Sequence, residues 1–416
     1  MRVTSRRVVV TGSGCITPLG NDVETVWKNL LAGQSGIAPI TKFDTEGMRV
    51  RFGGEIKDFN PADYIEAKKV SRLDPFSHIA IAASIQAFKE ANLDMEKEDH
   101  WRIGCIVASG IGGLTEITQQ HKRYLEKGPT RTNPFFIPKM MLNSASGAVA
   151  IELGLGGPNW AISSACASAN HALGSAYRTI QCKDADVMLA GGSESALVGL
   201  GLNGFANMQA LSMRNDDPTK ASRPFDKNRD GFVMGEGAAM FVLESLEHAE
   251  ERGATILAEI KGIGNSDDAY HITAPDADGS GAIRAMENAI QDAGIEKNEI
   301  TYVNAHGTST PLNDKIETLA LKKVFGEHAK NLAINSTKSM TGHLLGAAAA
   351  VEFLVLIQTL NNQKAHPTIN YETPDPDCDL DYIPNEAREI EAQYALSNSL
   401  GFGGHNSVLI AGRYTN

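Results

Sequence analysis

Short apolar runs alternate with longer helical stretches along most of the chain. The runs at residues 8–10, 103–108 and 300–303 consist mainly of Val, Ile, Ala and other apolar residues, as expected for buried β-strands. Strands that alternate with helical segments are typical of βαβ units, whose crossovers are almost always right-handed. The pattern therefore predicts an α/β protein with mainly parallel sheets.

The chain also repeats itself once. Residues 161–174 and 333–346 each contain a short apolar strand, a polar turn and a helix rich in Ala and Gly, which places Cys166 and Lys338 at equivalent positions. Small side chains in both helices permit close packing against a neighbouring helix. Residues 103–109 likewise resemble 300–306, and residues 235–242 resemble 403–410.

Two related α/β halves are therefore predicted, residues 1–253 and 254–416. The halves differ in one place, because the first carries an extra segment at about residues 112–143. This segment contains an aromatic loop flanked by prolines, and we expect it either to cap a pocket or to pack on a partner subunit. A purely structural role is the alternative.

Hydropathy bears on localisation. The N-terminal apolar stretch is too short for a signal peptide, and the longest apolar run, residues 344–360, is interrupted by Glu352 and Gln358. A membrane span needs ~20 apolar residues. We expect a buried helix at 344–360, no membrane insertion and a cytoplasmic protein.

Charge and cysteine content narrow the function classes. The five cysteines are odd in number and lack CxxC spacing, which argues against disulfides and against a zinc site. With 50 acidic and 38 basic residues the net charge is −12, which is a poor match for nucleic acid. An acidic partner would need a local basic patch, and the candidates for it are Lys68, Lys69, Arg72, Arg131 and Arg214.

Cys166 is the first candidate for chemistry. It lies on the predicted turn between a strand and a helix, with Ala165, Ala167 and Ser168 around it. The N-terminus of a helix carries unpaired N–H groups and partial positive charge, which lower a thiol pKa and can bind an oxyanion. Its small neighbours leave room for a bulky group. The alternative is a buried, inert cysteine.

Two histidines end the equivalent strands of the second half. His306 is followed by a run of hydroxyl residues, and His343 closes the segment that begins at Lys338. Such positions lie at the carboxyl edge of a parallel sheet, where α/β folds place their sites. Each histidine alone could be a structural residue of a turn, but convergence with Cys166 favours a common site.

A glycine-rich turn at residues 401–404 contains one aromatic residue, Phe402. Its glycines let the backbone approach a ligand and present an N–H to an oxyanion. The turn lacks the strand-GxGxxG-helix context of a dinucleotide site. No Walker loop and no metal-binding His/Asp/Glu pattern accompanies it.

Together these four motifs, in this order and over essentially the whole chain, resemble β-ketoacyl-[acyl-carrier-protein] synthases of the thiolase superfamily. The resemblance implies a thiolase-like αβαβα five-layered sandwich of two pseudo-duplicated halves, usually a homodimer. It also implies an acyltransferase that elongates fatty acids by decarboxylative Claisen condensation of malonyl carrier protein. The carrier protein would bring its own phosphopantetheine, so no cofactor and no metal are expected at the site.

The resemblance also assigns roles to single residues. Cys166 would carry the acyl chain, with the N–H groups of Cys166 and Phe402 as oxyanion hole, and His306 and His343 would bind the malonyl thioester carbonyl. Lys338, paired with the buried acid Glu352, would set the local electrostatics. The remaining substrate-site residues would be Thr308 and Thr310 on the pantetheine arm, Ile111 on the wall of the acyl pocket and Phe402 as its gate.

Ile111 and the Pro311-to-Asp314 ending resemble the synthase II branch of the family. The nearest alternative is a ketosynthase of a type II polyketide or specialised fatty acid pathway. A degradative thiolase would have a second cysteine where this chain has Phe402, and an initiating synthase would have asparagine at His343. A chain-length factor would lack Cys166. A non-catalytic scaffold would keep the fold without thiol chemistry.

Overall fold

Two five-stranded sheets with the same strand order form the centre of the molecule. In the computed structural model, which describes residues 6–415, the first sheet has the order β5-β4-β6-β7-β1 and the second the order β10-β9-β13-β14-β8. The first three strands of each run parallel, and the last two join antiparallel. The strands of the first sheet are β1 (Val8–Ile16), β4 (Ile103–Ala108), β5 (Asn159–Ile162), β6 (Val187–Glu194) and β7 (Gly237–Ser245). Those of the second are β8 (Ala258–Asp267), β9 (Ile300–Asn304), β10 (Ala333–Asn335), β13 (Tyr394–Gly401) and β14 (His405–Gly412).

The sheets are joined at one end. Val8, Val9 and Val10 of β1 pair antiparallel with residues 258–260 of β8, so that the strands form one continuous ladder of ten. The predicted similarity of residues 103–109 to 300–306 corresponds to β4 and β9, which hold equivalent places in the two sheets. The proposed boundary at residue 253 lies in the turn before β8.

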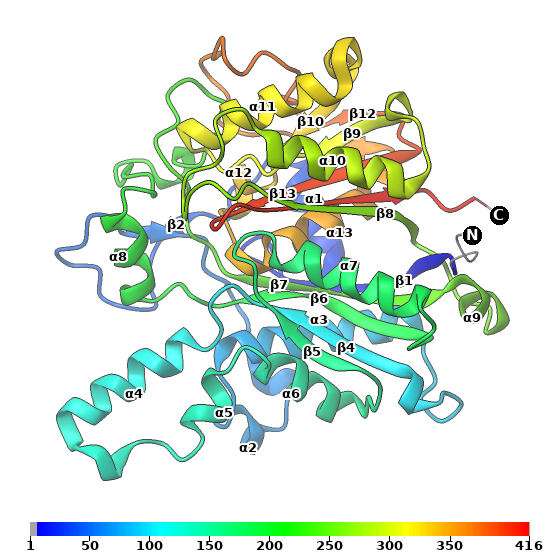
Figure 1. The fold of residues 1–416 in the computed structure, drawn as a ribbon. Helices are drawn as coiled ribbons and strands as arrows, with labels where there is room; N and C mark the ends of the chain where they lie inside the picture. Colours follow the sequence, from blue (N-terminus) through cyan, green and yellow to red (C-terminus); the bar gives the residue numbers. More distant parts are fainter. Residues whose placement is uncertain (1–5, 416) are drawn as a thin grey trace.

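Helices complete five layers (Figure 1). Helices α3 (Pro75–Ala91) and α6 (Ser144–Leu153) cover the outer face of the first sheet, and α10 (Ser280–Ala293) and α11 (Pro311–Phe325) cover the second. Between the sheets lie α7 (Ser168–Gln181) and α13 (Ala348–Asn362). The predicted αβαβα sandwich is confirmed.

The buried helix expected at residues 344–360 is present as α13. Of the described residues, one stretch, Leu345–Asn362, has the length and apolarity of a membrane span, but 83% of it is buried inside the protein. Helix α13 packs against β13 and α7, so its apolar length is explained by its place between the two sheets.

The extra segment of the first half projects from the body, at the lower left of Figure 1. It contains α4 (Leu114–Lys127) and α5 (Phe136–Met140). Asp74, which caps the start of α3, accepts a hydrogen bond from the Glu116 N–H at 2.8 Å, and buried Lys139 forms an ion pair with Glu116. The Asp74 contact fixes the segment to the outer helical layer, and the ion pair joins α5 to α4 within it.

The remaining elements are short. They are α1 (Val23–Leu31), α2 (Ala67–Val70), α8 (Gly199–Asn207), α9 (Leu246–Glu251), α12 (Lys338–Thr341), the strand pairs β2 (Ala38–Pro39) with β3 (Phe52–Gly53) and β11 (Lys364–Ala365) with β12 (Arg388–Glu389), and 3₁₀ turns at Pro61–Asp63, His100–Arg102, Pro129–Arg131, Pro218–Lys220, Lys297–Glu299, Gly326–Asn331 and Leu345–Ala347.

Candidate active site

Cys166 lies on the turn between β5 and α7, as predicted. Ala165 just before it has φ 51°, a left-handed conformation that is costly for a residue with a Cβ and is held only by its surroundings. The turn packs against Gly401, where a Cβ would lie 2.9 Å from the Ser164 carbonyl oxygen and 3.2 Å from the Cys166 nitrogen. Only glycine permits this approach, which brings the Phe402 N–H to the thiol.

His343 contacts the thiol directly, with Nε2 at 2.9 Å from Cys166 Sγ. The N–H of Leu345 donates to Nδ1 of the same imidazole at 3.1 Å. Leu345 has φ 49°, and this left-handed backbone belongs to the turn that directs its N–H back to the ring. Because Nδ1 accepts, the neutral imidazole carries its proton on Nε2 and donates it toward the sulfur.

Burial raises the pKa of the Cys166 thiol to about 11, against the opposing effects of Lys338 and the Phe402 N–H. The free thiol is therefore protonated at neutral pH. The His343 N–H is placed to stabilise negative charge on the sulfur when it develops.

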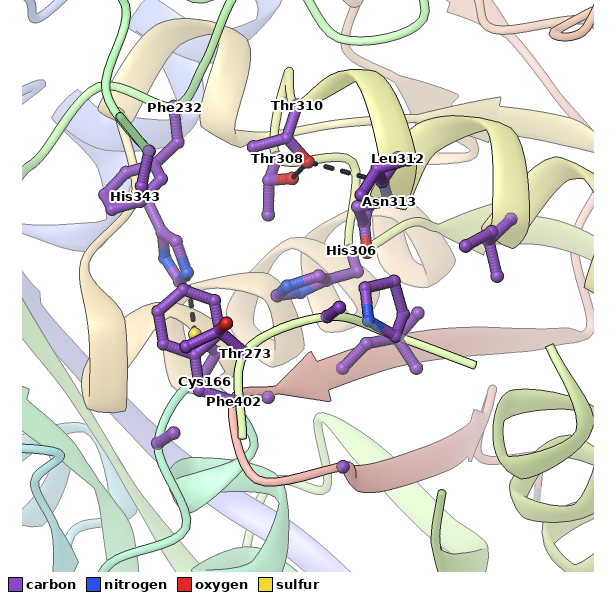
Figure 2. Close-up of a pocket in the computed structure, with 18 of the residues that line it drawn as sticks. Cys166, Phe232, Thr273, His306, Thr308, Thr310, Leu312, Asn313, His343 and Phe402 are labelled. Atoms are coloured by element: carbon purple, nitrogen blue, oxygen red, sulfur yellow. Dashed lines mark hydrogen bonds between the residues drawn. The ribbon is translucent and has the colours of Figure 1, made fainter. Parts of the chain in front are cut away.

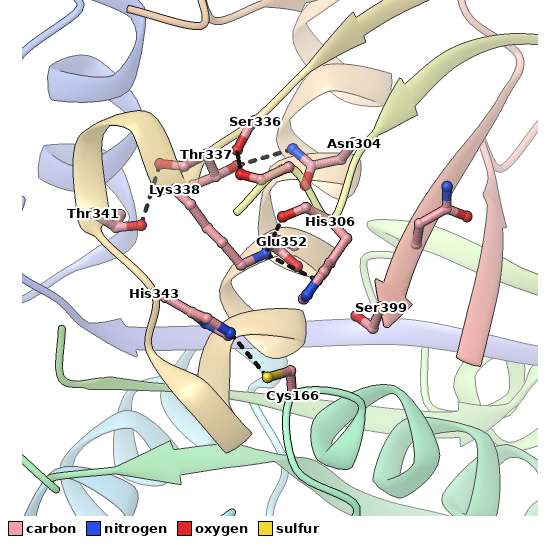
Figure 3. Close-up of polar contacts among 12 residues, drawn as sticks. Cys166, Asn304, His306, Ser336, Thr337, Lys338, Thr341, His343, Glu352 and Ser399 are labelled. Atoms are coloured by element: carbon pink, nitrogen blue, oxygen red, sulfur yellow. Dashed lines mark hydrogen bonds and ion pairs between the residues drawn. The ribbon is translucent and has the colours of Figure 1, made fainter. Parts of the chain in front are cut away.

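His306 is held from behind by Lys338 (Figure 3). The Lys338 ammonium donates to the His306 carbonyl oxygen at 2.7 Å and lies 3.4 Å from Nδ1 of the ring. Its third partner is the carboxylate of Glu352, in an ion pair whose two side chains are each 2% exposed. An ammonium group only donates, so Nδ1 of His306 is again the acceptor and Nε2 carries the proton.

Both imidazoles stay neutral. Burial, followed by the Lys338 charge, lowers the pKa of His306 and of His343 well below its usual value. The rings lie 5.5 Å apart, nearly perpendicular to each other, and the Phe232 ring packs edge-on against His343 at 5.3 Å. The site thus contains two neutral N–H donors next to one thiol, which suits a developing oxyanion.

A soft metal is disfavoured at this trio despite its geometry. Cys166, His306 and His343 offer ligand atoms within 4.8 Å of one another. A metal would need the lone pair on each Nε2. Leu345 and Lys338 donate to the Nδ1 atoms of His343 and His306, so each Nε2 carries the proton and has no free lone pair.

Within residues 6–415, three buried side-chain oxygens near these elements lack a hydrogen-bond partner. Asn304 Oδ1, Glu352 Oε2 and Ser397 Oγ are buried and have no hydrogen-bond partner among the described residues. Asn304 and Ser397 are paired across β9 and β13, so their side chains leave the sheet on the same face. Amide and hydroxyl oxygens are among the ligands that hard cations prefer, so Asn304 and Ser397 are candidates for holding one.

A cavity of about 510 Å³ opens onto the reacting groups (Figure 2). Its lining includes most of the predicted site residues, namely Ile111, Cys166, His306, Thr308, Thr310, His343 and Phe402. The hydroxyls of Thr308 and Thr310 are 3.0 Å apart on the approach to His306. Glu352 forms the expected pair with Lys338, but it does not line the cavity and so does not belong with the substrate-site residues.

Two fully buried carboxylates were missed from the sequence. Glu317 on α11 accepts from the backbone N–H groups of His306 at 2.7 Å and Gly307 at 2.8 Å. Glu194 at the end of β6 accepts from three backbone N–H groups, those of Gly110, Ile111 and Gly346, and from the Ser109 hydroxyl. The available signal for Glu194 was an acidic residue at the end of an apolar strand.

Comparison with known proteins agrees with this geometry. The family descriptions "Beta-ketoacyl synthase, N-terminal domain" and "Beta-ketoacyl synthase, C-terminal domain" match residues 5–249 and 257–372. The chain is 49% identical over 98% of its length to a 3-oxoacyl-[acyl-carrier-protein] synthase 2 of Synechocystis, covering 98% of that protein. It is 50% identical to the Staphylococcus aureus protein of the same name, with 98% of each chain covered.

A solved type II polyketide ketosynthase, in complex with its acyl-carrier protein, superimposes with a TM-score of 0.90 at 37% identity, covering 99% of this chain and 100% of that one. Both halves match the family descriptions, two relatives are about 50% identical over nearly the whole chain, and the fold is shared with a solved ketosynthase. The chain therefore belongs to the β-ketoacyl synthase family.

Proposed function

We propose that the chain elongates fatty acids by condensing malonyl carrier protein with an acyl chain carried on Cys166, as a synthase of the II type. The observation that carries this proposal is the convergence of a thiol from the first half and two neutral imidazoles from the second on one cavity. A direct test is incubation with acyl and malonyl carrier proteins, which should yield the 3-oxoacyl product and CO₂. Absence of product with every primer length would contradict it.

The first half-reaction loads the chain. Cys166 sulfur attacks the thioester carbonyl of acyl carrier protein, and the carbonyl electron pair moves onto oxygen next to the N–H groups of Cys166 and Phe402. Collapse expels the pantetheine thiolate, which takes up the proton that the Cys166 thiol has lost. The net result is an acyl-Cys166 thioester and free carrier protein.

The second half-reaction forms the carbon–carbon bond. The malonyl thioester oxygen accepts from the Nε2–H groups of His306 and His343, and the C–CO₂⁻ bond breaks so that its electron pair forms the enolate. The enolate carbon then attacks the acyl-Cys166 carbonyl. The C–S bond breaks, the product leaves on its carrier, and the thiolate regains a proton from solvent.

Fatty acid elongation is favoured over a polyketide pathway. Relatives named 3-oxoacyl-[acyl-carrier-protein] synthase 2 are 49% and 50% identical to the chain, whereas the polyketide ketosynthase is 37% identical. Under this proposal the phosphopantetheine arm belongs to the carrier, Thr308 and Thr310 contact it, and the enzyme works in the cytoplasm without a cofactor of its own.

Carrier docking is proposed at the basic candidates. Lys68 and Lys69 on α2 pair with Glu66 and Glu152, and Arg72 lies 5.4 Å from the centre of the Phe135 ring in the extra segment. Arg131 is exposed on the same segment, whereas Arg214 lies near Asp230 at the cavity.

Reversal of Lys68 and Lys69 to glutamate should raise the KM for carrier-bound substrates severalfold, because an acidic carrier meets like charge there. The effect should shrink at high salt. Steady-state kinetics with carrier-bound and free pantetheine substrates test this docking site, with Lys330→Glu on the 3₁₀ turn Gly326–Asn331 as control. Equal effects on both substrate types would rule out docking.

Ile111 is proposed to limit the acyl pocket. It lines the cavity and packs with Leu114, Phe205 and Leu202. Ile111→Phe adds volume to a packed wall, which costs ~1–3 kcal/mol where the extra atoms meet bound substrate. Turnover should move toward short primers across a series from six to sixteen carbons. An unchanged chain-length profile would mean that Ile111 does not limit the pocket.

A homodimer through β5 is also proposed. This strand ends the ten-strand ladder, and Trp160 on it is 38% exposed. The Pro158 and Ile162 carbonyls face β4, so Ala161, one residue out of phase, directs its N–H outward. Ala161→Pro removes that donor without removing a hydrogen bond between β5 and β4. The variant should be a monomer in light scattering. A persistent dimer would contradict pairing at this edge.

A further inference from the structure

Glu194 joins the two halves of the site through one oxygen atom. The residue ends β6 and is 0% exposed. Its Oε2 accepts hydrogen bonds from the N–H of Gly110 at 2.7 Å and from the N–H of Gly346 at 3.0 Å. Gly110 follows β4 of the first sheet, and Gly346 follows His343 in the second half. Both backbones therefore depend on one acceptor.

The other oxygen holds the pocket wall. Oε1 accepts from the Ser109 hydroxyl at 2.9 Å and from the Ile111 N–H at 3.3 Å. All four contacts come from neutral donors, and no described Lys or Arg forms an ion pair with this carboxylate. An arrangement with donors on both oxygens fits a carboxylate and not an amide, because an amide offers only one oxygen.

The two backbones lie in direct contact at this point. A Cβ on Gly346 would lie 2.1 Å from the Gly110 nitrogen and 2.9 Å from Glu194 Oε2. Gly346 directly follows Leu345, whose N–H sets the proton position on His343. Displacement of the Gly110–Ile111 turn by the acyl chain therefore acts on the segment that aligns His343, and the carboxylate is the link.

We propose that Glu194 is a positioning residue that couples the fit of the acyl chain against Ile111 to the alignment of His343. This inference rests on the proposed function, because it assumes an acyl chain at Ile111 and decarboxylation at His343. The residue touches neither substrate, and it acts through the backbones of Ile111 and Gly346.

Glu194→Gln tests the proposal because it keeps the size of the side chain but sets an NH₂ group against backbone N–H donors. A buried donor left without its acceptor is costly, and we expect the kcat of malonyl carrier protein decarboxylation to fall ~10-fold. KM for malonyl carrier protein and the rate of Cys166 acylation by a short primer should change less than ~2-fold, since no contact to Cys166 is lost. The preference among primer lengths should broaden.

Glu244→Gln is the matched control. Glu244 is another fully buried carboxylate on the first sheet, in β7, and it binds Thr11, His248 and Arg252 away from the cavity. Its replacement should lower thermal stability without separating the two half-reactions. If Glu194→Gln lowers acylation and decarboxylation by the same factor, or changes neither, Glu194 is a structural clamp only and the proposal is wrong.

Ser109→Ala covers the case in which Glu194→Gln does not fold. It removes one donor to Oε1 and leaves the Oε2 bridge intact. The primer-length profile should then shift through Ile111, and decarboxylation should fall with it, though by less than in Glu194→Gln. An unchanged profile overturns the proposal. Failure of the wild type itself to load an acyl group on Cys166 would instead count against the proposed function.

Discussion

Cys166→Ala is expected to abolish condensation, with a loss of more than ~10³-fold in kcat, because the covalent route needs a nucleophile that no neighbouring side chain replaces. Decarboxylation of malonyl carrier protein should continue, since His306 and His343 keep their Nε2–H groups. Product formation and CO₂ release are measured separately on the same samples.

Cys182→Ala is the control for this variant. Cys182 is exposed at the end of α7, the helix whose start lies just beyond Cys166, and its loss should leave both rates unchanged. Condensation at wild-type rate by Cys166→Ala would show that the acyl chain is carried elsewhere.

His306→Ala and His343→Ala should each lower decarboxylation by ~10²–10³-fold, the usual effect of removing one donor to a developing oxyanion. Acyl loading should fall less, because the first tetrahedral intermediate uses backbone N–H groups. Rates of CO₂ release and of acyl transfer to Cys166 measure the two effects. His328→Ala serves as control, because the His328 ring contacts the Ile300 carbonyl at the start of β9, at the opposite end of the strand from His306.

The pH dependence follows from the same groups. Burial and Lys338 lower the pKa of both imidazoles, so the neutral donor form is already complete at pH 8 and stays so as the pH falls to 6. Neither histidine should contribute a pH limb to decarboxylation in that range.

A His306→Ala or His343→Ala variant that decarboxylates normally but fails to load acyl groups would contradict the roles given to these residues.

Much of this site follows from local sequence. The strand-turn-helix pattern puts Cys166 at a turn, and the repeat places Lys338 at the equivalent turn of the second half. His306 is predicted at the same edge of the sheets because it follows the end of a strand, and in the structure it lines the same cavity as Cys166. The pattern works because apolar periodicity fixes strands and helices, and strand ends converge in parallel sheets.

Other features depend on long-range contacts that local patterns do not encode. Leu345 has a left-handed φ, which directs its N–H to His343, but leucine rarely adopts this conformation, so the sequence does not indicate it. Glu194 binds the backbone of Gly110 and Gly346, which lie 84 and 152 positions away in the sequence. The pairing of β1 with β8 at the sheet junction is likewise tertiary.

In the proposed mechanism an acyl-Cys166 thioester is the species that the malonyl-derived enolate attacks. Mass spectrometry over a single turnover tests this step. The protein first receives an acyl group from acyl carrier protein, is then freed of excess primer and is finally mixed with malonyl carrier protein. The protein should gain the mass of one acyl group, found on the Cys166 peptide after digestion, and this group should disappear at the rate at which 3-oxoacyl carrier protein and CO₂ form. Product formation without the adduct, or an adduct that persists while product accumulates, would contradict it.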